Sequence, residues 1–297
     1  MERSGRDCRP VCRGFAGLIS GSTRILGVIG HPVAHTASPA MHNAAIAALG
    51  LDYAYMAFHV EPECLHEAIA GMRALEIAGL NVTVPHKQEV MQCVDEVSKE
   101  AVVIGAVNTI ANRDGRLVGY NTDAFGFIES LKRDGGMETL PAQVALLGAG
   151  GAARAILYAL LERPEVERVL LLNRTVAKAE ALAADLDQND KVEVGSMADS
   201  GIADAGLVIN STSVGMHPNE GESPLVDASL LHADMLVADI VYKPQKTRLM
   251  EEAEAVGAKS INGLGMLAWQ GARSFEIWTG IMPPVDRMIA AALERFK

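Results

Sequence analysis

The stretch Val144–Ala155, VALLGAGGAARA, decides the fold of this 297-residue chain. Its continuous apolar start is typical of a buried strand, and its alanine-rich end is typical of a helix. Between them, Gly148, Gly150 and Ala153 form the pattern G-x-G-x-x-A. In a dinucleotide-binding turn the first glycine permits the tight turn, the second lets the backbone approach a pyrophosphate, and the third small residue lets helix and strand pack closely. An ordinary glycine-rich turn is the alternative.

The end of the next strand indicates which dinucleotide this turn would bind. NAD-binding units usually place an acidic residue about 20 residues after the glycines, where it holds the ribose 2′-hydroxyl. Here RVLLL is followed by Asn173, Arg174 and Thr175, and Lys178 comes three residues later. A guanidinium is a permanently charged, bidentate partner for a 2′-phosphate. The sequence therefore predicts NADP rather than NAD.

Both halves of the chain repeat the order strand, helix, strand that builds a mostly parallel sheet. In the first half we expect strands at 24–30, 53–60 and 79–84, with helices at 38–50, 62–75 and 85–97. Ser38 and Pro39 are suitable as the N-cap and first residue of one helix. A hairpin is expected at 106–123, around the Asp-Gly of NRDG. The second half should contain strands at 144–147, 168–174, 206–212 and 235–241, helices at 152–162 and 177–186, and final helices at 266–280 and 284–296.

A polar, glycine-rich break at 132–143 separates the two series. We therefore expect an α/β protein of two domains with a cleft between them. Residues 22–131 form the first domain, which the C-terminal helices 265–297 complete, and residues 132–264 form the dinucleotide-binding Rossmann domain. Residues 1–21 are basic and weakly patterned, and we expect a disordered extension there.

The composition excludes several classes of protein. The net charge of −11 argues against a nucleic-acid partner. No apolar run reaches the roughly 18 residues of a membrane span. The four cysteines lack the paired spacing of a zinc site, and His31, His35 and His42 lack a matching ligand set, so no metal is expected. Without a convincing signal peptide we expect the cytoplasm.

Polar residues gather at the strand ends of the first domain, where open α/β sheets bind their ligands. They are Asn81, Thr83, Lys87, Asn108 and Asp123. Lys87 falls in the first turn of the helix expected after Pro85, whose dipole would disfavour an ammonium, whereas Asp123 would favour it. Opposing influences of this kind poise a lysine for proton transfer to the oxygen of a carbonyl being reduced. From spacing alone, a catalytic pair and a surface salt bridge are both open.

Eight motifs together resemble the shikimate dehydrogenases, over nearly the whole chain from Arg24. They are GVIGHPVAHTASPAMHN (27–43), NVTVPHK (81–87), GAVNT (105–109), GYNTD (119–123), GAGGAARA (148–155), NRT (173–175), NSTSVGM (210–216) and GLGMLAWQ (263–270). The resemblance implies NADPH-dependent, reversible reduction of 3-dehydroshikimate to shikimate, on the way to chorismate and the aromatic amino acids. It also implies that the enzyme is a monomer or a homodimer.

The resemblance further implies roles for single residues. Lys87 would be the acid/base and Asp123 its partner, with Asn81 supporting them. The substrate would contact Thr36, Ser38, Thr83, Lys87, Asn108, Asp123, Tyr242 and Gln270. The cofactor would contact Gly148, Ala149, Gly150, Gly151, Ala152, Asn173, Arg174, Thr175, Lys178, Ser211, Thr212, Val241, Gly263 and Met266.

The chain departs from the family pattern at Thr36. The family usually has two serines in HSxSP, whereas this chain reads HTASP. The threonine keeps the hydroxyl and adds a methyl group beside the expected carboxylate of the substrate. Use of quinate, which carries an extra hydroxyl there, is therefore an alternative. A relative that binds metabolite or cofactor without catalysis is another, although the presence of both Lys87 and Asp123 argues against it.

Overall fold

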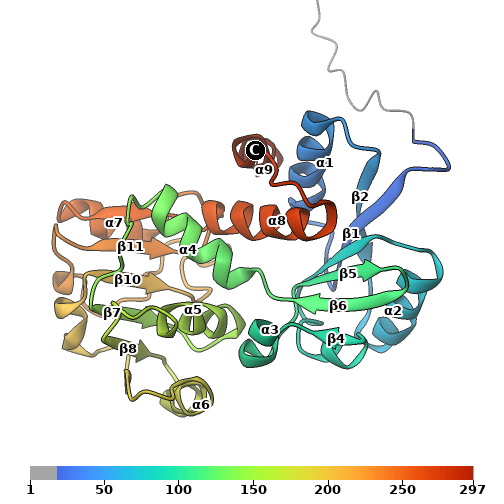
Figure 1. Cartoon of the computed structure of the whole chain (residues 1–297). Coiled ribbons are helices and arrows are strands. Elements are labelled where there is room, and N and C mark those ends of the chain that lie inside the picture. Colours follow the sequence, from blue (N-terminus) through green and yellow to red (C-terminus); the bar gives the residue numbers. More distant parts are fainter. Residues whose placement is uncertain (1–18, 297) are drawn as a thin grey trace, which may run out of the picture.

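The computed structural model describes residues 19–296, which fold into two six-stranded sheets joined by helices (Figure 1). Nearly all of the extension expected at 1–21 lies outside this range, as do Cys8 and Cys12. None of the helices within 19–296 has the length and hydropathy needed to cross a membrane.

The first sheet is mixed and has the strand order β2-β1-β3-β5-β6-β4. Only β5 runs antiparallel to its neighbours, because it is joined to β6 by the tight hairpin turn at Asp114 and Gly115. Its strands are β1 (Arg24–Gly30), β2 (Tyr53–His59), β3 (Gly79–Val82), β4 (Glu96–Val97), β5 (Thr109–Arg113) and β6 (Arg116–Tyr120).

Helices between these strands follow the expected order with one clear exception. They are α1 (Ser38–Leu49), the 3₁₀ turn η1 (Pro62–Cys64) with α2 (Leu65–Ala74), the 3₁₀ turn η2 (Glu89–Gln92) and α3 (Lys99–Ile104). Gly50 ends α1 in a left-handed conformation, as a C-terminal glycine should.

The helix expected from Pro85 to about Val97 is wrong. Turns follow Pro85, η2 covers four residues, and Glu96–Val97 pairs with β6 as strand β4. Tertiary packing decides this segment, since Val90 is fully buried in the core beneath the sheet. The helix begins only at Lys99, where the Ser98 side chain accepts a hydrogen bond from the Ala101 N–H. Lys87 therefore lies in a turn, and the helix-dipole argument for it does not hold.

The second sheet is entirely parallel and has the order β12-β11-β10-β7-β8-β9. Its strands are β7 (Gln143–Leu147), β8 (Arg168–Leu172), β9 (Val192–Gly195), β10 (Leu207–Asn210), β11 (Leu236–Asp239) and β12 (Lys259–Ile261). The helices α5 (Gly151–Leu161), α6 (Val176–Leu186) and α7 (Arg248–Ala255) accompany it, with the 3₁₀ turns η3 (Ser200–Asp204) and η4 (Ala228–Leu230). No strand was expected at β9 or β12, and no helix at α7 or at 123–133.

Of the three remaining helices of the described chain, two lie between the sheets. Figure 1 shows α4 (Asp123–Arg133) and α8 (Leu264–Thr279) side by side between them, and α9 (Val285–Phe296) packs on α1. One face of α4 belongs to the core of the second sheet through Phe127, Ile128 and Leu131. The aromatic residues of α8, by contrast, enter the core of the first sheet. The chain therefore returns to its first sheet after completing the second.

His42 of α1 lies in that first core. Its ring stacks on Tyr55 with 4.2 Å between ring centroids, and Phe275 and Trp278 of α8 pack around it. Only 1% of the residue is exposed, and its Nδ1 has no hydrogen-bond partner. Burial lowers the pKa of His42 from 6.5 to about 3, so the imidazole is neutral in the folded protein.

Stability should therefore fall as the pH drops from 6.5 towards 3, because the unfolded chain takes up a proton there and the folded chain does not. At pH 5 this linkage costs ~2 kcal/mol relative to pH 8. His42→Phe, which keeps an aromatic ring but cannot titrate, should remove that part of the dependence in urea unfolding at the two pH values. An unchanged pH dependence in the variant would show that His42 does not titrate in this way.

Candidate active site

A cavity of about 380 Å³ lies between the two sheets. The loop after β1, the end of β3 and the start of α4 form one side, and the segments after β11 and β12 with α8 form the other. All eight residues predicted to contact substrate line it: Thr36, Ser38, Thr83, Lys87, Asn108, Asp123, Tyr242 and Gln270. Residues that are more than 200 positions apart in sequence are thus brought to one small polar site.

Lys87 and Asp123 form an ion pair in the wall of this cavity. Lys87 Nζ lies 2.7 Å from Asp123 Oδ2, and the side chains are 30% and 12% exposed. The backbone carbonyl of Lys87 accepts a hydrogen bond from Val107 N, which ties the turn to the entry of β5. Asp123 is the first residue of α4, where the helix dipole favours a carboxylate. The pair is partly buried and lines the cavity, which distinguishes it from a solvent-exposed surface salt bridge.

The second oxygen of Asp123 is also held. Asn108 Nδ2 donates to Asp123 Oδ1 at 2.8 Å, and Asn121 Oδ1 accepts the Asp123 backbone N–H at 2.9 Å. Each carboxylate oxygen therefore has its own donor, which fixes the plane of the group.

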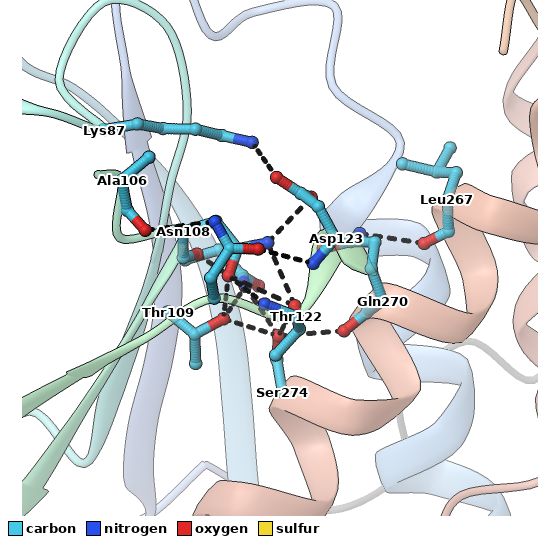
Figure 2. A network of polar contacts seen from close by, with 11 residues as sticks. Lys87, Ala106, Asn108, Thr109, Thr122, Asp123, Leu267, Gln270 and Ser274 are labelled. Carbon is cyan, nitrogen blue, oxygen red and sulfur yellow. Dashed lines mark hydrogen bonds and ion pairs between the residues drawn. The ribbon is translucent and has the colours of Figure 1, made fainter. Parts of the chain in front are cut away.

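Several buried polar residues behind this pair are absent from the sequence-based site. Figure 2 shows Thr109, Thr122 and Ser274 joined to Asn108 by a continuous set of hydrogen bonds. Asn81, which was expected to support the site, belongs to this network through Ser274. A weak signal existed: Ser274 lies one helical turn after Gln270 on an otherwise apolar face of α8.

Thr36 and Ser38 bond to each other at the start of α1. Thr36 Oγ1 donates to Ser38 Oγ at 3.1 Å and accepts the Ser38 N–H at 3.2 Å. Ser38 was expected as the N-cap, but it is the first helical residue, and Ala37 occupies the N-cap without a side-chain bond. The N–H of Ser38 is taken by Thr36, so the chain turns one residue earlier than expected. Both hydroxyls border the cavity beside a helix N-terminus, a favourable place for an anion.

Tyr242 and Gln270 close the opposite side of the cavity. The Tyr242 ring stacks on Phe296 of α9, with 5.2 Å between centroids, and burial raises the pKa of its hydroxyl. Tyr242 is therefore a neutral hydrogen-bonding group at physiological pH. Gln270 Nε2 donates to Leu267 O within α8 at 2.8 Å.

The glycine turn after β7 has the geometry that a pyrophosphate requires. Gly148 has a φ of +109°, and a Cβ there would lie 2.7 Å from Ser211 Oγ, so other residues are excluded. A Cβ at Gly150 or Gly151 would meet nothing within 4 Å, so the backbone borders open space. Helix α5 begins at Gly151 and directs its unpaired first N–H groups, including that of Ala152, into this space. These residues fit a dinucleotide.

The residues after β8 fit a 2′-phosphate. Arg174, Thr175 and Lys178 are exposed around the N-terminus of α6, and Asn173 Nδ2 fixes the turn by donating to Thr175 O at 2.8 Å. Neither Arg174 nor Lys178 forms an ion pair with any residue of the described part of the chain. Both positive charges are thus free for a ligand.

The remaining predicted cofactor residues lie between the glycine turn and the cavity. Ser211 Oγ donates to Leu147 O at 2.7 Å, beside Thr212 at the end of β10. Gly263 and Met266 line the cavity, whereas Val241 is buried and instead accepts the Gly263 N–H at 3.1 Å. Gly263 has no room for a side chain, since a Cβ would lie 1.9 Å from Ile240 O.

A parallel dinucleotide-binding sheet that shares a cavity with a second sheet carrying a Lys–Asp pair defines a two-domain, NADP-dependent oxidoreductase. Comparisons with known proteins agree. Three family models match: the shikimate dehydrogenase substrate binding domain (28–110), shikimate/quinate 5-dehydrogenase (132–240) and the shikimate 5′-dehydrogenase C-terminal domain (263–293).

Individual relatives carry the same name. The shikimate dehydrogenase (NADP⁺) of Methanopyrus kandleri is 45% identical, covering 94% of this chain and 98% of the relative, and that of Symbiobacterium thermophilum is 49% identical, covering 92% and 95%. A crystal structure of a shikimate dehydrogenase with NADP⁺ has a TM-score of 0.88 at 43% identity, covering 94% of this chain and 98% of the other. The chain belongs to the shikimate dehydrogenase family, NADP-dependent oxidoreductases that act on a CH–OH group.

Arg174→Ala should raise KM for NADP⁺ about 10- to 100-fold, since hydrogen bonds to charged groups contribute about 1.5–3 kcal/mol. KM for NAD⁺, which lacks the phosphate, should change less than about twofold. Initial rates with each cofactor measure both constants. Arg163→Ala, at the other end of α5, is the control and should affect neither. Equal effects of Arg174→Ala on the two cofactors would remove the proposed phosphate contact.

Proposed function

We propose that this chain catalyses the reversible reduction of 3-dehydroshikimate to shikimate, with NADPH as the reductant. The observation that carries the proposal is the 2.7 Å contact between Lys87 Nζ and Asp123 Oδ2 in a cavity that both sheets line. A carbonyl reduction needs a proton donor within reach of the carbonyl oxygen, and this pair is the proton-transferring group of the cavity.

NADPH, when bound, supplies the hydride. The chain's own residues would place it: Gly148, Ala149, Gly150, Gly151 and Ala152 at the pyrophosphate, and Asn173, Arg174, Thr175 and Lys178 at the 2′-phosphate. Ser211, Thr212, Val241, Gly263 and Met266 lie between that turn and the cavity, on the side proposed for the nicotinamide. The carboxyl end of the second sheet therefore faces the substrate site, as in open α/β sheets generally.

Lys87 carries the proton in this proposal. As the carbonyl carbon accepts the hydride, the Lys87 ammonium transfers a proton to the carbonyl oxygen, which becomes the hydroxyl of shikimate. Asp123 holds the ammonium in place and stabilises its charge before the transfer. In the reverse direction neutral Lys87 accepts the hydroxyl proton.

The other cavity residues orient the ring. Thr36 and Ser38, whose hydroxyls lie 3.1 Å apart beside the start of α1, receive the substrate carboxylate. Tyr242 closes the carboxylate end. Thr83, Asn108 and Gln270 contact the ring hydroxyls. Because Gln270 belongs to α8, which packs against α4, substrate contact from the C-terminal helix is fixed relative to Asp123.

The same proposal assigns residues 22–131 and 265–297 to a substrate domain and 132–264 to a cofactor domain. The helix α4 makes this division less sharp, since its first residue lies in the active site while its apolar face belongs to the core of the second sheet. The location in the cytoplasm and a monomeric or homodimeric state stay predictions.

Quinate is a second candidate substrate because of Thr36. The methyl group of Thr36 lies beside the proposed carboxylate site, where quinate carries one more hydroxyl than shikimate. We expect kcat/KM for shikimate to exceed that for quinate by at least about 100-fold, as an unpaired polar group in a fitted site costs a few kcal/mol. Spectrophotometric assays of NADP⁺ reduction with each substrate test this. Comparable values, together with a loss of quinate use in Thr36→Ser, would favour the dual-substrate alternative.

Lys87→Met keeps most of the apolar stem and removes the acid. We expect kcat to fall about 100- to 10,000-fold, the usual contribution of general acid–base catalysis. Shikimate should still bind, because Thr36, Ser38 and Gln270 remain, and calorimetric titration measures this. Lys132→Met, on the surface of α4, is the matched control and should keep full activity. Turnover near the wild-type rate in Lys87→Met would contradict the proposed role.

A further inference from the structure

The side-chain amide of Asn108 can occupy only one of its two orientations. Its Oδ1 accepts the Thr122 backbone N–H at 2.9 Å, and this N–H can only donate. Its Nδ2 then faces Asp123 Oδ1 at 2.8 Å. If the amide turned over, its oxygen would face the carboxylate and its NH₂ would face the Thr122 N–H, so both contacts would become repulsive. Whether Asn108 donates a hydrogen bond to Asp123 therefore depends on the groups that fix the orientation of the Asn108 amide.

The buried hydroxyl groups of Thr109 and Ser274 support this orientation of the Asn108 amide. Thr109 Oγ1 donates to Asn108 Oδ1 at 2.9 Å, and it lies 2.7 Å from Ser274 Oγ. Ser274 Oγ also donates to Gln270 O at 3.0 Å within α8, and either hydroxyl can supply the hydrogen of its contact with Thr109. Both residues are 0% exposed, and hydrogen bonds in such surroundings strengthen one another.

The orientation of the Asn81 side-chain amide, which bonds to Ser274, is also fixed. Tyr55 OH donates to Asn81 Oδ1 at 2.7 Å, which directs Asn81 Nδ2 to Ser274 Oγ at 3.0 Å. Burial raises the pKa of Tyr55 well above 10.0, so its hydroxyl remains a donor. A continuous series of hydrogen bonds therefore runs from Tyr55 through Asn81, Ser274 and Thr109 to Asn108.

We propose that Thr109 and Ser274 are positioning residues of the active site, whose hydroxyls hold the Asn108 amide so that it donates to Asp123. Neither residue lines the cavity or contacts Lys87 (Figure 2), and both act through Asn108. Ser274 belongs to α8, one turn after Gln270, so the same contact sets the helix that carries Gln270 against β5. The inference rests on the proposed role of Asp123 as the partner of Lys87.

Substitutions can remove these hydroxyls without leaving a donor unpaired. Thr109→Val is nearly isosteric, and β-branched valine suits strand β5. In Ser274→Ala, Asn81 Nδ2 keeps Asn108 O and Thr109 Oγ1 as acceptors, both at 3.2 Å. Thr109→Ser restores the hydroxyl and is the rescue variant.

The matched control is Ser130→Ala. Ser130 is also a buried hydroxyl, 2% exposed, and donates to Phe127 O at 2.7 Å within α4. It has no bond to Asn108 or Asp123, so it reports what loss of a buried hydroxyl does to stability alone.

The test is steady-state oxidation of shikimate by NADP⁺, with Tm recorded for each variant. We expect Thr109→Val and Ser274→Ala each to lower kcat about 3- to 10-fold. KM for NADP⁺ should be unchanged, and the double variant should be no worse than about the poorer single one. Thr109→Ser should lie within about twofold of wild type.

Each outcome decides between readings. A wild-type kcat in both variants would overturn the inference, even if their Tm falls as much as that of Ser130→Ala. A wild-type chain without shikimate-dependent NADP⁺ reduction would instead refute the proposed function itself.

Discussion

Close contact between α4 and α8 at Gly126 is the constraint on which the active site depends. A Cβ at Gly126 would lie 2.6 Å from Gln270 N and 2.8 Å from Met266 O, so only glycine allows the backbones to approach so far. Three residues that line the cavity lie on these two helices: Asp123 begins α4, and α8 carries Met266 and Gln270. Because the apolar face of α4 belongs to the core of the second sheet and the aromatic face of α8 to that of the first, this contact sets the two sheets against each other.

Five buried polar residues form a hydrogen-bonded cluster near this contact. Asn81, Asn108, Thr109, Thr122 and Ser274 are all at most 7% exposed, and each forms several hydrogen bonds. A buried polar group without a partner costs a few kcal/mol, so such a cluster stabilises one arrangement strongly and tolerates few others. The cluster reaches the Asp123 carboxylate through the Asn108 amide. The side proposed for the cofactor differs. There the exposed side chains of Arg174 and Lys178 and the open backbone at Gly150 and Gly151 follow the ends of parallel strands.

Much of this could be predicted from the sequence, for reasons that are local. Apolar periodicity and capping residues predict the glycine turn, the first strands of the two sheets and the final helices. Arg174, in place of an acidic residue after β8, indicates NADP. The segment 85–97 could not be predicted, because its conformation depends on Val90 in the core and on pairing with β6, both non-local. Ser274 and Thr109 were missed for the same reason: 165 residues separate them, and only the return of α8 to the first sheet brings their hydroxyls together.

In the proposed mechanism Lys87, held by Asp123, exchanges the proton with the reacting oxygen of the substrate. The most direct measurement is a crystal structure of the chain with shikimate and NADP⁺ bound. It should place Lys87 Nζ within about 2.6–3.2 Å of the hydroxyl whose carbon faces the nicotinamide, with Asp123 still bonded to Asn108. A hydroxyl at that carbon lying beyond hydrogen-bond reach of Lys87, or a Lys87 that contacts the substrate carboxylate instead, would contradict the claim.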